Sequence, residues 1–383
     1  KRYLKNSKRI YSMNDAEIPE VDRQDGTNHP RHTKILYGHK TSQLDFLDAF
    51  NTNRLHHAWM ISGPRGVGKA TLGYKISKFI LSQNQSSELI NNELQNTLDI
   101  PLDHPVSRRI DALGEPNLYL VRRIWDEKLK KFKQNITVDE IRKLKNFFNM
   151  SATDGGWRVA IIDSADEMNN SAANALLKIL EEPPKKVLIL LITHQPLRLM
   201  PTIRSRCRSL TCKSLSSEDL TKALEQLEIG DVYNNEQINI LANGSVGSSV
   251  ELTSNDGIEI YNSFIQLAGQ IPQLNRQLVQ SIADACTGKN ASKKYELTLQ
   301  LFILFTSRLA KFGASNRQVN NGILPSEAKA FYNLAPDIQS ARKWANFTQI
   351  ISERTNHARS VNLDPSMVIL DMLLKFEETS KKH

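Results

Sequence analysis

A glycine-rich segment between two apolar stretches constrains the fold of this chain more than any other feature. Residues 63–70 read Gly-Pro-Arg-Gly-Val-Gly-Lys-Ala and match the G-x-x-x-x-G-K-[ST] pattern except at its last position. In this pattern the glycines let successive backbone N–H groups surround phosphate oxygens, and the start of the next helix adds a favourable partial charge. The sequence therefore predicts a strand, a phosphate-binding loop and a helix, although a glycine-rich turn without a ligand would look similar.

The loop departs from the pattern where magnesium would be bound. The Ser or Thr that normally ligates the ion is replaced by Ala70, and Thr71 points about 100° further round the helix, which makes it a poor substitute. We expect a loop that can hold phosphate and is poorly equipped to cleave it; whether ATP or ADP still binds is left open. The candidate nucleotide-binding residues in and after the loop are Gly63, Gly66, Gly68, Lys69 and Thr71.

Continuous apolar strands alternate with helical patterns in the middle of the chain. Strands are predicted at 58–62, 117–121, 157–162 and 187–193, and helices at 71–81, after Thr137, and at 171–182. Such strands form a parallel sheet that is covered on both faces, and such sheets bind ligands at the carboxyl ends of their strands. Asp163 and Thr193 end two of these strands and join the candidate site, although Asp163 could be a solvated carboxylate and Thr193 a hydroxyl bonded to backbone.

The strand patterns stop at about residue 214, and helical spacing continues to the end of the chain. We predict an α/β domain followed by all-α parts. The expected divisions are a flexible leader at 1–31, a phosphate-loop domain at 32–213, a small helical lid at 214–271 and a helical C-terminal domain at 272–383.

Composition and charge limit the partners, the metal sites and the cellular compartment that we expect for this protein. The 383 residues carry a formal net charge of +9, which favours contact with polyanions or acidic partners. Three scattered cysteines are too few for a disulfide framework or a four-thiolate zinc site, and no apolar run reaches the roughly 20 residues of a membrane helix. We expect a cytoplasmic protein that has no membrane contact, no structural metal and no required cofactor.

The motifs together resemble a known family. The loop, the strand ending in Asp163-Ser164, residues 173–184 (Ala-Asn-Ala-Leu-Leu-Lys-Ile-Leu-Glu-Glu-Pro-Pro) and residues 203–207 (Ile-Arg-Ser-Arg-Cys) occur in the order and spacing of bacterial DNA polymerase III clamp-loader subunits, which are AAA+ ATPases. The resemblance extends from about residue 32 to 252 and is strongest to the delta-prime type. It implies an AAA+ phosphate-loop sheet domain, a lid and a C-terminal collar domain, to which residues 362–365 are similar.

Three departures from the family pattern concern ATP hydrolysis. Ala70 lacks the magnesium-binding hydroxyl, and Ser164 stands where an active member has a glutamate that activates water. Gly247 stands where the lid of an active member has an arginine that senses phosphate. The four zinc-binding cysteines of many relatives are also missing, so no zinc is expected. The resemblance therefore implies a member with a degenerate nucleotide site.

Arg206 is the catalytic residue that the resemblance retains. In the family, this arginine reaches into the nucleotide pocket of the neighbouring subunit as an arginine finger, although here it could be an ordinary exposed arginine. The resemblance implies a subunit without its own ATPase activity, in a hetero-oligomeric ring with delta and tau/gamma subunits, that serves sliding-clamp loading on primed DNA. The alternatives are an active tau/gamma-like motor that uses Lys69 and Asp163, and a generic DNA-binding module, which is disfavoured because no compact base-reading motif is visible.

Overall fold

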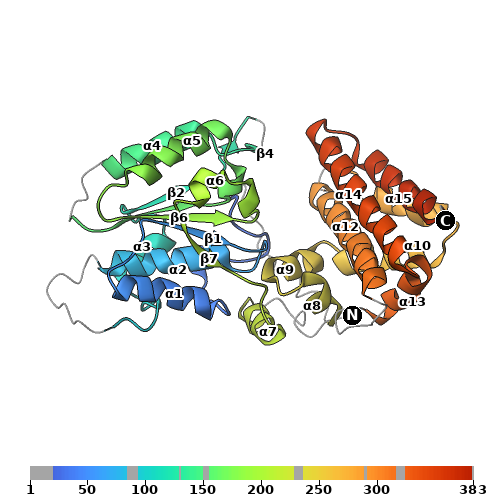
Figure 1. Ribbon diagram of the computed structural model, residues 1–383, viewed down its shortest axis with the longest axis horizontal. Helices are drawn as coiled ribbons and strands as arrows, with labels where there is room; N and C mark the ends of the chain where they lie inside the picture. Colours follow the sequence, from blue (N-terminus) through green and yellow to red (C-terminus); the bar gives the residue numbers. More distant parts are fainter. Residues whose placement is uncertain are drawn as a thin grey trace, which may run out of the picture. The chain divides into compact units, whose positions relative to one another are not determined.

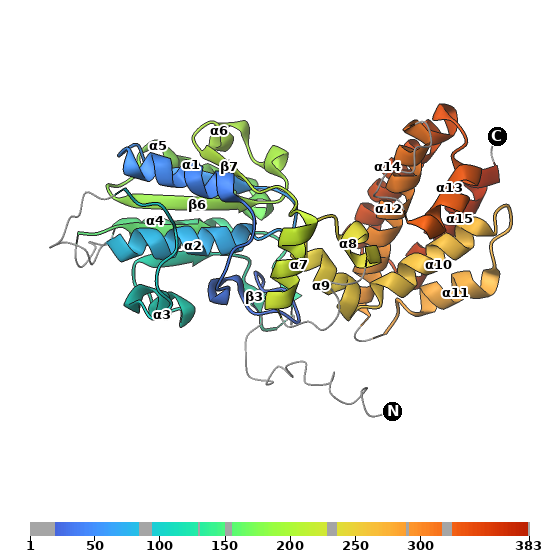
Figure 2. The ribbon, with the colours of Figure 1, turned by 90° about the horizontal axis from the view of Figure 1, so that it is seen from below.

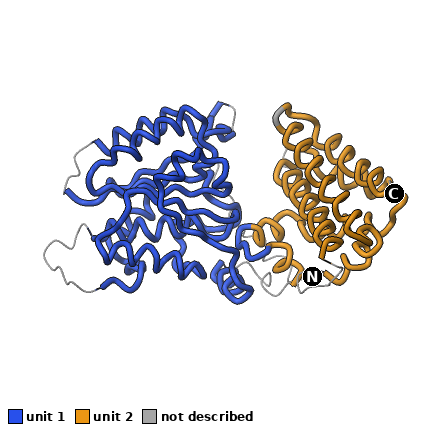
Figure 3. Tube along the Cα trace, viewed as in Figure 1, with its two compact units in different colours: residues 1–229, 243–247 blue, residues 230–242, 248–383 orange. Residues whose placement is uncertain are grey.

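The computed structural model describes residues 20–83, 94–128, 131–149, 155–227, 236–288, 291–315 and 324–381. The chain divides into two compact units, which Figure 3 shows in different colours. The first unit contains residues 1–229 and 243–247, and the second contains residues 230–242 and 248–383.

The first unit is built on a five-stranded parallel sheet (Figure 1). The strands lie in the order β2 (Leu118–Val121), β5 (Arg158–Ile162), β6 (Val187–Thr193), β1 (Ala58–Ser62) and β7 (Arg208–Thr211). Every residue of β5 and β6 is buried, as expected for strands with continuous apolar sequences. All carboxyl ends therefore meet at one edge of the sheet, where the phosphate loop follows β1.

Helices cover both faces of this sheet, as Figures 1 and 2 show. One face carries α1 (Lys40–Asn51), α2 (Lys69–Ser82) and α3 (Pro105–Asp111), and the other carries α4 (Val138–Asn149), α5 (Asn170–Glu181) and the short α6 (Pro201–Arg204). Side chains alternate along β1, so Trp59 and Ile61 join the first core, and Ala58 and Met60 join the second. The predicted parallel sheet with two covered faces is confirmed.

Local sequence sets the helix ends near the site. Asn169 accepts a hydrogen bond from the Ala172 N–H at the start of α5, and two prolines follow the end of this helix. Ser216 accepts from the Asp219 N–H at the start of α7 (Ser217–Gln226). The predicted strands and helices of the sheet domain differ from the observed ones by one or two residues at their ends. The sequence reasoning missed α1, β7 and a hairpin of β3 (Trp125–Asp126) and β4 (Lys131–Phe132).

The second unit is helical in its described residues. Its helices are α8 (Glu236–Ala242), most of α9 (Val246–Ser254), α10 (Gly257–Gly269), α11 (Arg276–Asp284), α12 (Ser292–Ala314), α13 (Pro325–Leu334), α14 (Ile338–Ser360) and α15 (Pro365–Lys381). One hydrophobic core runs from Ile238 to Phe376, and the Tyr261 hydroxyl donates to the buried Glu327 carboxylate. Since this core includes residues on both sides of position 271, the division between a lid and a collar stays a prediction.

The expected fold class of a phosphate-loop parallel-sheet domain with a mostly helical C-terminal part is confirmed by this architecture, in the residues that the structure describes. The leader expected at 1–31 stays a prediction: residues 20–31 lie against the sheet domain and run into the 3₁₀ helix η2 (Pro30–His32), and residues 1–19 lie outside the described part. Within the described residues, none of the helices is long and apolar enough to cross a membrane.

Candidate functional site

The phosphate loop has the backbone geometry that its glycines predict. Gly63, Gly66 and Gly68 have φ values of 150°, 75° and 101°, a region that side-chain-bearing residues rarely adopt. A Cβ atom on Gly63 would also lie 2.0 Å from the Cys212 carbonyl oxygen, so this glycine lets β1 and the end of β7 approach. Helix α2 then begins at Lys69. The loop therefore directs backbone N–H groups and a helix start toward the same space.

A cavity of about 230 Å³ lies beside this loop, within the first unit. Its walls come from the loop, residues 21–37, the carboxyl ends of β5 and β6, α7 and residues 246–247. The predicted site residues that line it are Gly66, Gly68, Lys69, Thr71 and Asp163. Gly63 and Thr193 do not line it; the Thr193 hydroxyl is buried and has no hydrogen-bond partner among the described residues, while its neighbours Ile192 and His194 line the cavity.

Lys69 is turned back into its own loop. The side chain is 3% exposed, and its ammonium donates to the carbonyl oxygen of Pro64. Burial lowers the pKa of Lys69 to about 8, against the opposing effect of nearby acidic groups that include Asp163. The lysine that would reach the outer phosphates of a nucleotide is therefore bonded to backbone in this structure.

The residues at the positions that would bind magnesium, Ala70 and Asp163, are poor ligands for this ion. Burial, with the neighbouring carboxylates of Asp22 and Glu167, raises the pKa of Asp163 to about 7. Ala70 contributes only a methyl group, which packs against the apolar core. A carboxyl that is half protonated at neutral pH is a poor ligand for a hard cation, which binds deprotonated oxygens. The residues present therefore fit magnesium poorly.

The position that follows Asp163 offers no carboxylate base. Ser164 has a φ of 57°, and its hydroxyl lies 3.4 Å from His194 Nε2. Burial and the nearby Lys69 ammonium lower the pKa of His194 to about 4, so its imidazole is neutral at pH 7. Glu167 also lines the cavity, but it forms an ion pair with Arg123 at 2.7 Å. The sequence reasoning missed His194, Glu167 and Arg123 as cavity residues. The only signal was the pair of polar residues at the end of β6, Thr193 and His194, which indicated His194.

Residues 245–247 touch the phosphate loop directly. The Ser245 hydroxyl donates to the Arg65 carbonyl at 2.8 Å, and the Gly247 N–H donates to the Gly66 carbonyl at 3.1 Å. A Cβ atom on Gly247 would lie 2.9 Å from Gly66 Cα, closer than real Cβ contacts come. Position 247, where the resemblance implies a phosphate-sensing arginine in active members, therefore has no room here for any side chain unless the two backbones separate.

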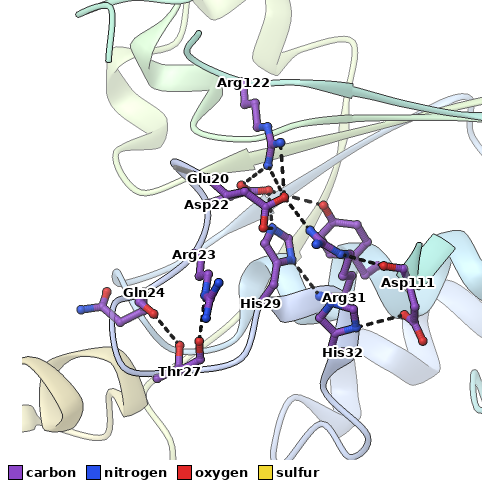
Figure 4. Close-up of polar contacts among 11 residues, drawn as sticks. Glu20, Asp22, Arg23, Gln24, Thr27, His29, Arg31, His32, Asp111 and Arg122 are labelled. Atoms are coloured by element: carbon purple, nitrogen blue, oxygen red, sulfur yellow. Dashed lines mark hydrogen bonds and ion pairs between the residues drawn. The ribbon is translucent and has the colours of Figure 1, made fainter. Parts of the chain in front are cut away.

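Residues 20–32, which we name the strap, form the second wall that the sequence did not predict (Figure 4). His29 Nε2 lies 3.0 Å from Asp22 Oδ2, and Arg122 pairs with the same carboxylate from the end of β2. Burial opposes ionisation of Asp22, but His29 and Arg122 together lower its pKa to about 2. No periodic sequence pattern predicts the contact between Asp22 and Arg122, because these residues are 100 positions apart in the chain.

Arg206 lies at the surface and does not line the cavity. Its side chain is 38% exposed, and it pairs with Glu181 at 2.9 Å and donates to the Thr202 carbonyl at 3.1 Å. Glu181, at the end of α5, is itself 49% exposed. The guanidinium is therefore held by partners that solvent or another protein could replace.

Comparison with known proteins shows what the sequence of this chain is similar to. A family model described as "DNA polymerase III, delta subunit" matches residues 38–216. The DNA polymerase III subunit delta' of Pseudomonas aeruginosa is 34% identical over 172 residues, which cover 44% of this chain and 48% of that protein. The subunit delta' of Bacillus subtilis is 31% identical over 229 residues, which cover 59% of this chain and 60% of that protein.

A further relative shows that the likeness extends to other subunit types. The DNA polymerase III subunit gamma of Buchnera aphidicola subsp. Schizaphis graminum is 27% identical over 234 residues, which cover 58% of this chain and 58% of that protein. The chain thus spans about half to three fifths of the length of these relatives. Residues 38–216 of this chain are therefore similar to the DNA polymerase III delta subunit family, and the relatives of more than 30% identity given above are delta' subunits.

Proposed function

We propose that this protein is an ATPase-deficient clamp-loader subunit that scaffolds the loader ring and donates Arg206 in trans to the ATP site of a neighbouring subunit. The proposal rests on the finding that Arg206 and the cavity beside the phosphate loop lie at different places in the first unit. Among the described residues that line the chain's own cavity, Ala70 and Ser164 stand where a magnesium-binding hydroxyl and a carboxylate base are expected, whereas Arg206 stands outside that cavity on an exposed surface.

The chemistry of the cavity supports the absence of intrinsic hydrolysis. ATP hydrolysis in phosphate-loop proteins relies on a magnesium ion held by a hydroxyl and a carboxylate, and on a group that positions the attacking water. The corresponding positions hold the methyl group of Ala70, a carboxyl of Asp163 with a pKa of about 7, and the hydroxyl of Ser164. A serine hydroxyl cannot act as a carboxylate base at neutral pH.

The surroundings of Arg206 support a role toward another subunit. Exposed ion pairs contribute about 0–1 kcal/mol, so exchanging Glu181 for a phosphate oxygen of a neighbour costs little. A guanidinium that stabilises the charge of a transferred phosphoryl group accelerates the reaction by about 10³ to 10⁵ in characterised cases. The partners we propose are the delta and tau/gamma subunits, and through the complex the sliding clamp and primed DNA.

The decisive experiment compares ATP turnover by the purified chain and by the complex assembled from all loader subunits. We expect no turnover by the chain alone, and normal assembly but slow turnover when the complex contains Arg206→Ala. Arg142→Ala is a matched control, because Arg142 is a surface arginine that pairs with Asp139 at 2.9 Å on α4. Equal turnover by the Arg206→Ala and Arg142→Ala complexes would contradict the finger role.

An active motor of the tau/gamma kind is the second candidate. The intact glycines and lysine of the loop favour it, as does the likeness to a relative named subunit gamma. This candidate predicts ATP turnover by the isolated chain that is abolished by Lys69→Ala. Turnover of that kind would replace our first proposal.

A further inference from the structure

The Arg206 guanidinium rests against the carboxyl end of a helix in its own domain. Helices α5 and α6 lie side by side in the first unit (Figures 1 and 2). Arg206 Nη2 lies 2.9 Å from Glu181 Oε1, and Glu181 is the last residue of α5. The carbonyl oxygens of a last helical turn carry partial negative charge, which favours a cation and disfavours a carboxylate. Arg206 therefore offsets the charge of Glu181 and that of the helix end.

The backbone of Arg206 is held more firmly than its side chain. Its N–H donates to the Ile203 carbonyl at 3.1 Å, and the Ile203 side chain is fully buried in the core beneath α5. The guanidinium lies at the surface, where Nη1 donates to the Thr202 carbonyl of the same short segment. A change of partner at Glu181 therefore needs rotations about side-chain bonds and leaves the fold of the domain intact.

The Glu181 carboxylate has other cations in its surroundings. A surface groove of about 430 Å³ is lined by Glu181, by Lys145 of α4 and by Lys178 of α5. Both lysines are exposed. When Arg206 changes its partner, the Glu181 carboxylate is thus left in contact with water and in one groove with two ammonium groups. Release of the guanidinium does not create a buried unpaired charge, which keeps its cost low.

Charge decides which group can take the place of Glu181. A carboxylate carries one negative charge, whereas the terminal phosphate of a nucleoside triphosphate carries more charge, spread over three oxygens. A planar guanidinium can donate to two of these oxygens at once. Exchange of Glu181 for a terminal phosphate is therefore favourable, whereas exchange for water gains no comparable contact.

We propose that Glu181 is a positioning residue that competes with the neighbouring subunit's nucleotide for Arg206: it holds the guanidinium on its own domain and yields it to a terminal phosphate. This inference rests on the proposed function, in which Arg206 acts on that phosphate, and it names the group from which the arginine must be exchanged. The contact with Glu181 is made before the reaction and lost during it, so it slows the reaction. Removal of the Glu181 charge makes ATP hydrolysis by the complex faster.

A substitution of Glu181 and one of its neighbour in the sequence test this competition. Glu181→Gln removes the charge and keeps the size of the side chain. Glu182→Gln is the matched control, because Glu182 is an exposed carboxylate at the same helix end and lines the same groove, whereas the ion pair to Arg206 comes from Glu181. Circular dichroism of each chain and size-exclusion chromatography of each complex check folding and assembly.

The first measurement is single-turnover ATP hydrolysis by the assembled loader, which isolates the phosphoryl-transfer step from product release. We expect Glu181→Gln to raise the rate about two- to fivefold, the range that an exposed ion pair allows, and Glu182→Gln to leave it unchanged. An equal or slower rate with Glu181→Gln overturns the proposal, as does the same gain with Glu182→Gln.

Two further comparisons test whether the gain acts through Arg206 and through charge. In a complex that contains Arg206→Ala, the additional substitution Glu181→Gln should have no effect. Raising the ionic strength from about 0.05 M to about 0.5 M should bring the ratio of the Glu181→Gln rate to the unmodified rate toward one, because salt screens an exposed pair. A gain that persists without Arg206, or that salt does not reduce, overturns the proposal.

The isolated chain provides a readout that does not depend on the proposed function. NMR relaxation of the Arg206 side-chain nitrogens reports how firmly the guanidinium is held. We expect restricted motion in the unmodified chain and in Glu182→Gln, and larger motion in Glu181→Gln. Equal motion in all three chains overturns the hold by Glu181. Normal hydrolysis by the Arg206→Ala complex contradicts the proposed function, whereas slow hydrolysis there without a gain from Glu181→Gln contradicts this inference alone.

Discussion

Charged side chains have different surroundings in the cavity beside the phosphate loop and at the surface around Arg206. In the cavity, Lys69 donates to a backbone carbonyl, and burial displaces the pKa values of Lys69, Asp163 and His194 to about 8, 7 and 4. At the surface, Arg206 and Glu181 stay exposed. The cavity therefore changes the ionisation of the groups that line it, whereas the exposed ion pair leaves the Arg206 guanidinium able to change partners. The proposed function depends on this contrast.

The largest effect that we predict is on ATP turnover by the assembled complex, and it tests the contrast between the cavity and the surface around Arg206. Arg206→Lys keeps the charge but loses the planar fork that contacts two oxygens at once. We expect this variant to lose most of the rate effect of about 10³ to 10⁵ that an arginine finger supplies. The measurement is steady-state ATP turnover by the assembled loader. A complex with Arg206→Lys that works at the normal rate would mean that only the charge matters.

The next prediction concerns the pH dependence of the free energy of unfolding, which tests the raised pKa of Asp163 in the cavity. Folded Asp163 keeps its proton up to about pH 7, whereas in the unfolded chain it ionises near pH 4, so its contribution destabilises the fold as pH rises from about 4 to 7. Asp163→Asn should remove this loss and raise the free energy of unfolding at pH 8 by about 2–4 kcal/mol, with little change below pH 4. Urea unfolding at several pH values measures it. An unchanged pH profile would contradict the raised pKa.

The contact between residue 247 and the phosphate loop predicts a smaller effect. Alanine usually stabilises a helix relative to glycine by about 1 kcal/mol, but here its Cβ atom would press on the Gly66 backbone. We expect Gly247→Ala to lower the free energy of unfolding by about 1–2 kcal/mol, as overpacking does. Gly269→Ala is the control, since a Cβ atom there meets nothing within 4 Å. Equal stability of the two variants in thermal unfolding would argue against a tight joint.

The smallest expected effect concerns Arg206 in the isolated chain. Because its ion pair is exposed, Arg206→Ala should change the free energy of unfolding by less than about 1 kcal/mol. Chemical denaturation of the purified protein measures this. A loss of several kcal/mol would show that the guanidinium holds its own domain together, and the contrast with the cavity would fail.

Sequence reasoning located the elements whose patterns are local. The apolar runs of β5 and β6 and the glycines of the phosphate loop specify their structures within a few residues, and Asp163, a predicted site residue, lines the cavity. β7 escaped notice because three of its four residues are exposed and polar or charged, so it has no apolar run. Edge strands of this kind depend on pairing with a neighbour, which no single segment reveals.

The rest of the site depends on partners that are distant in the chain. Asp22 and Arg122 give no local signal, so the strap looked like a leader. Gly247 was recognised as a departure from the family pattern, but the reason for a glycine there became visible only with the Gly66 backbone beside it. Thr193 was placed at the site from its strand position, yet the alternation of side chains turns its neighbours toward the cavity.

The hydrogen bonds from residues 245 and 247 to the phosphate loop have a mechanical consequence. The Ser245 hydroxyl and the Gly247 N–H bond the main chain of the loop itself, so hydrogen bonds between two segments of one chain make this contact without any bound phosphate. Under the proposed function, this joint would keep one geometry while the ATP-hydrolysing subunits of the loader change theirs.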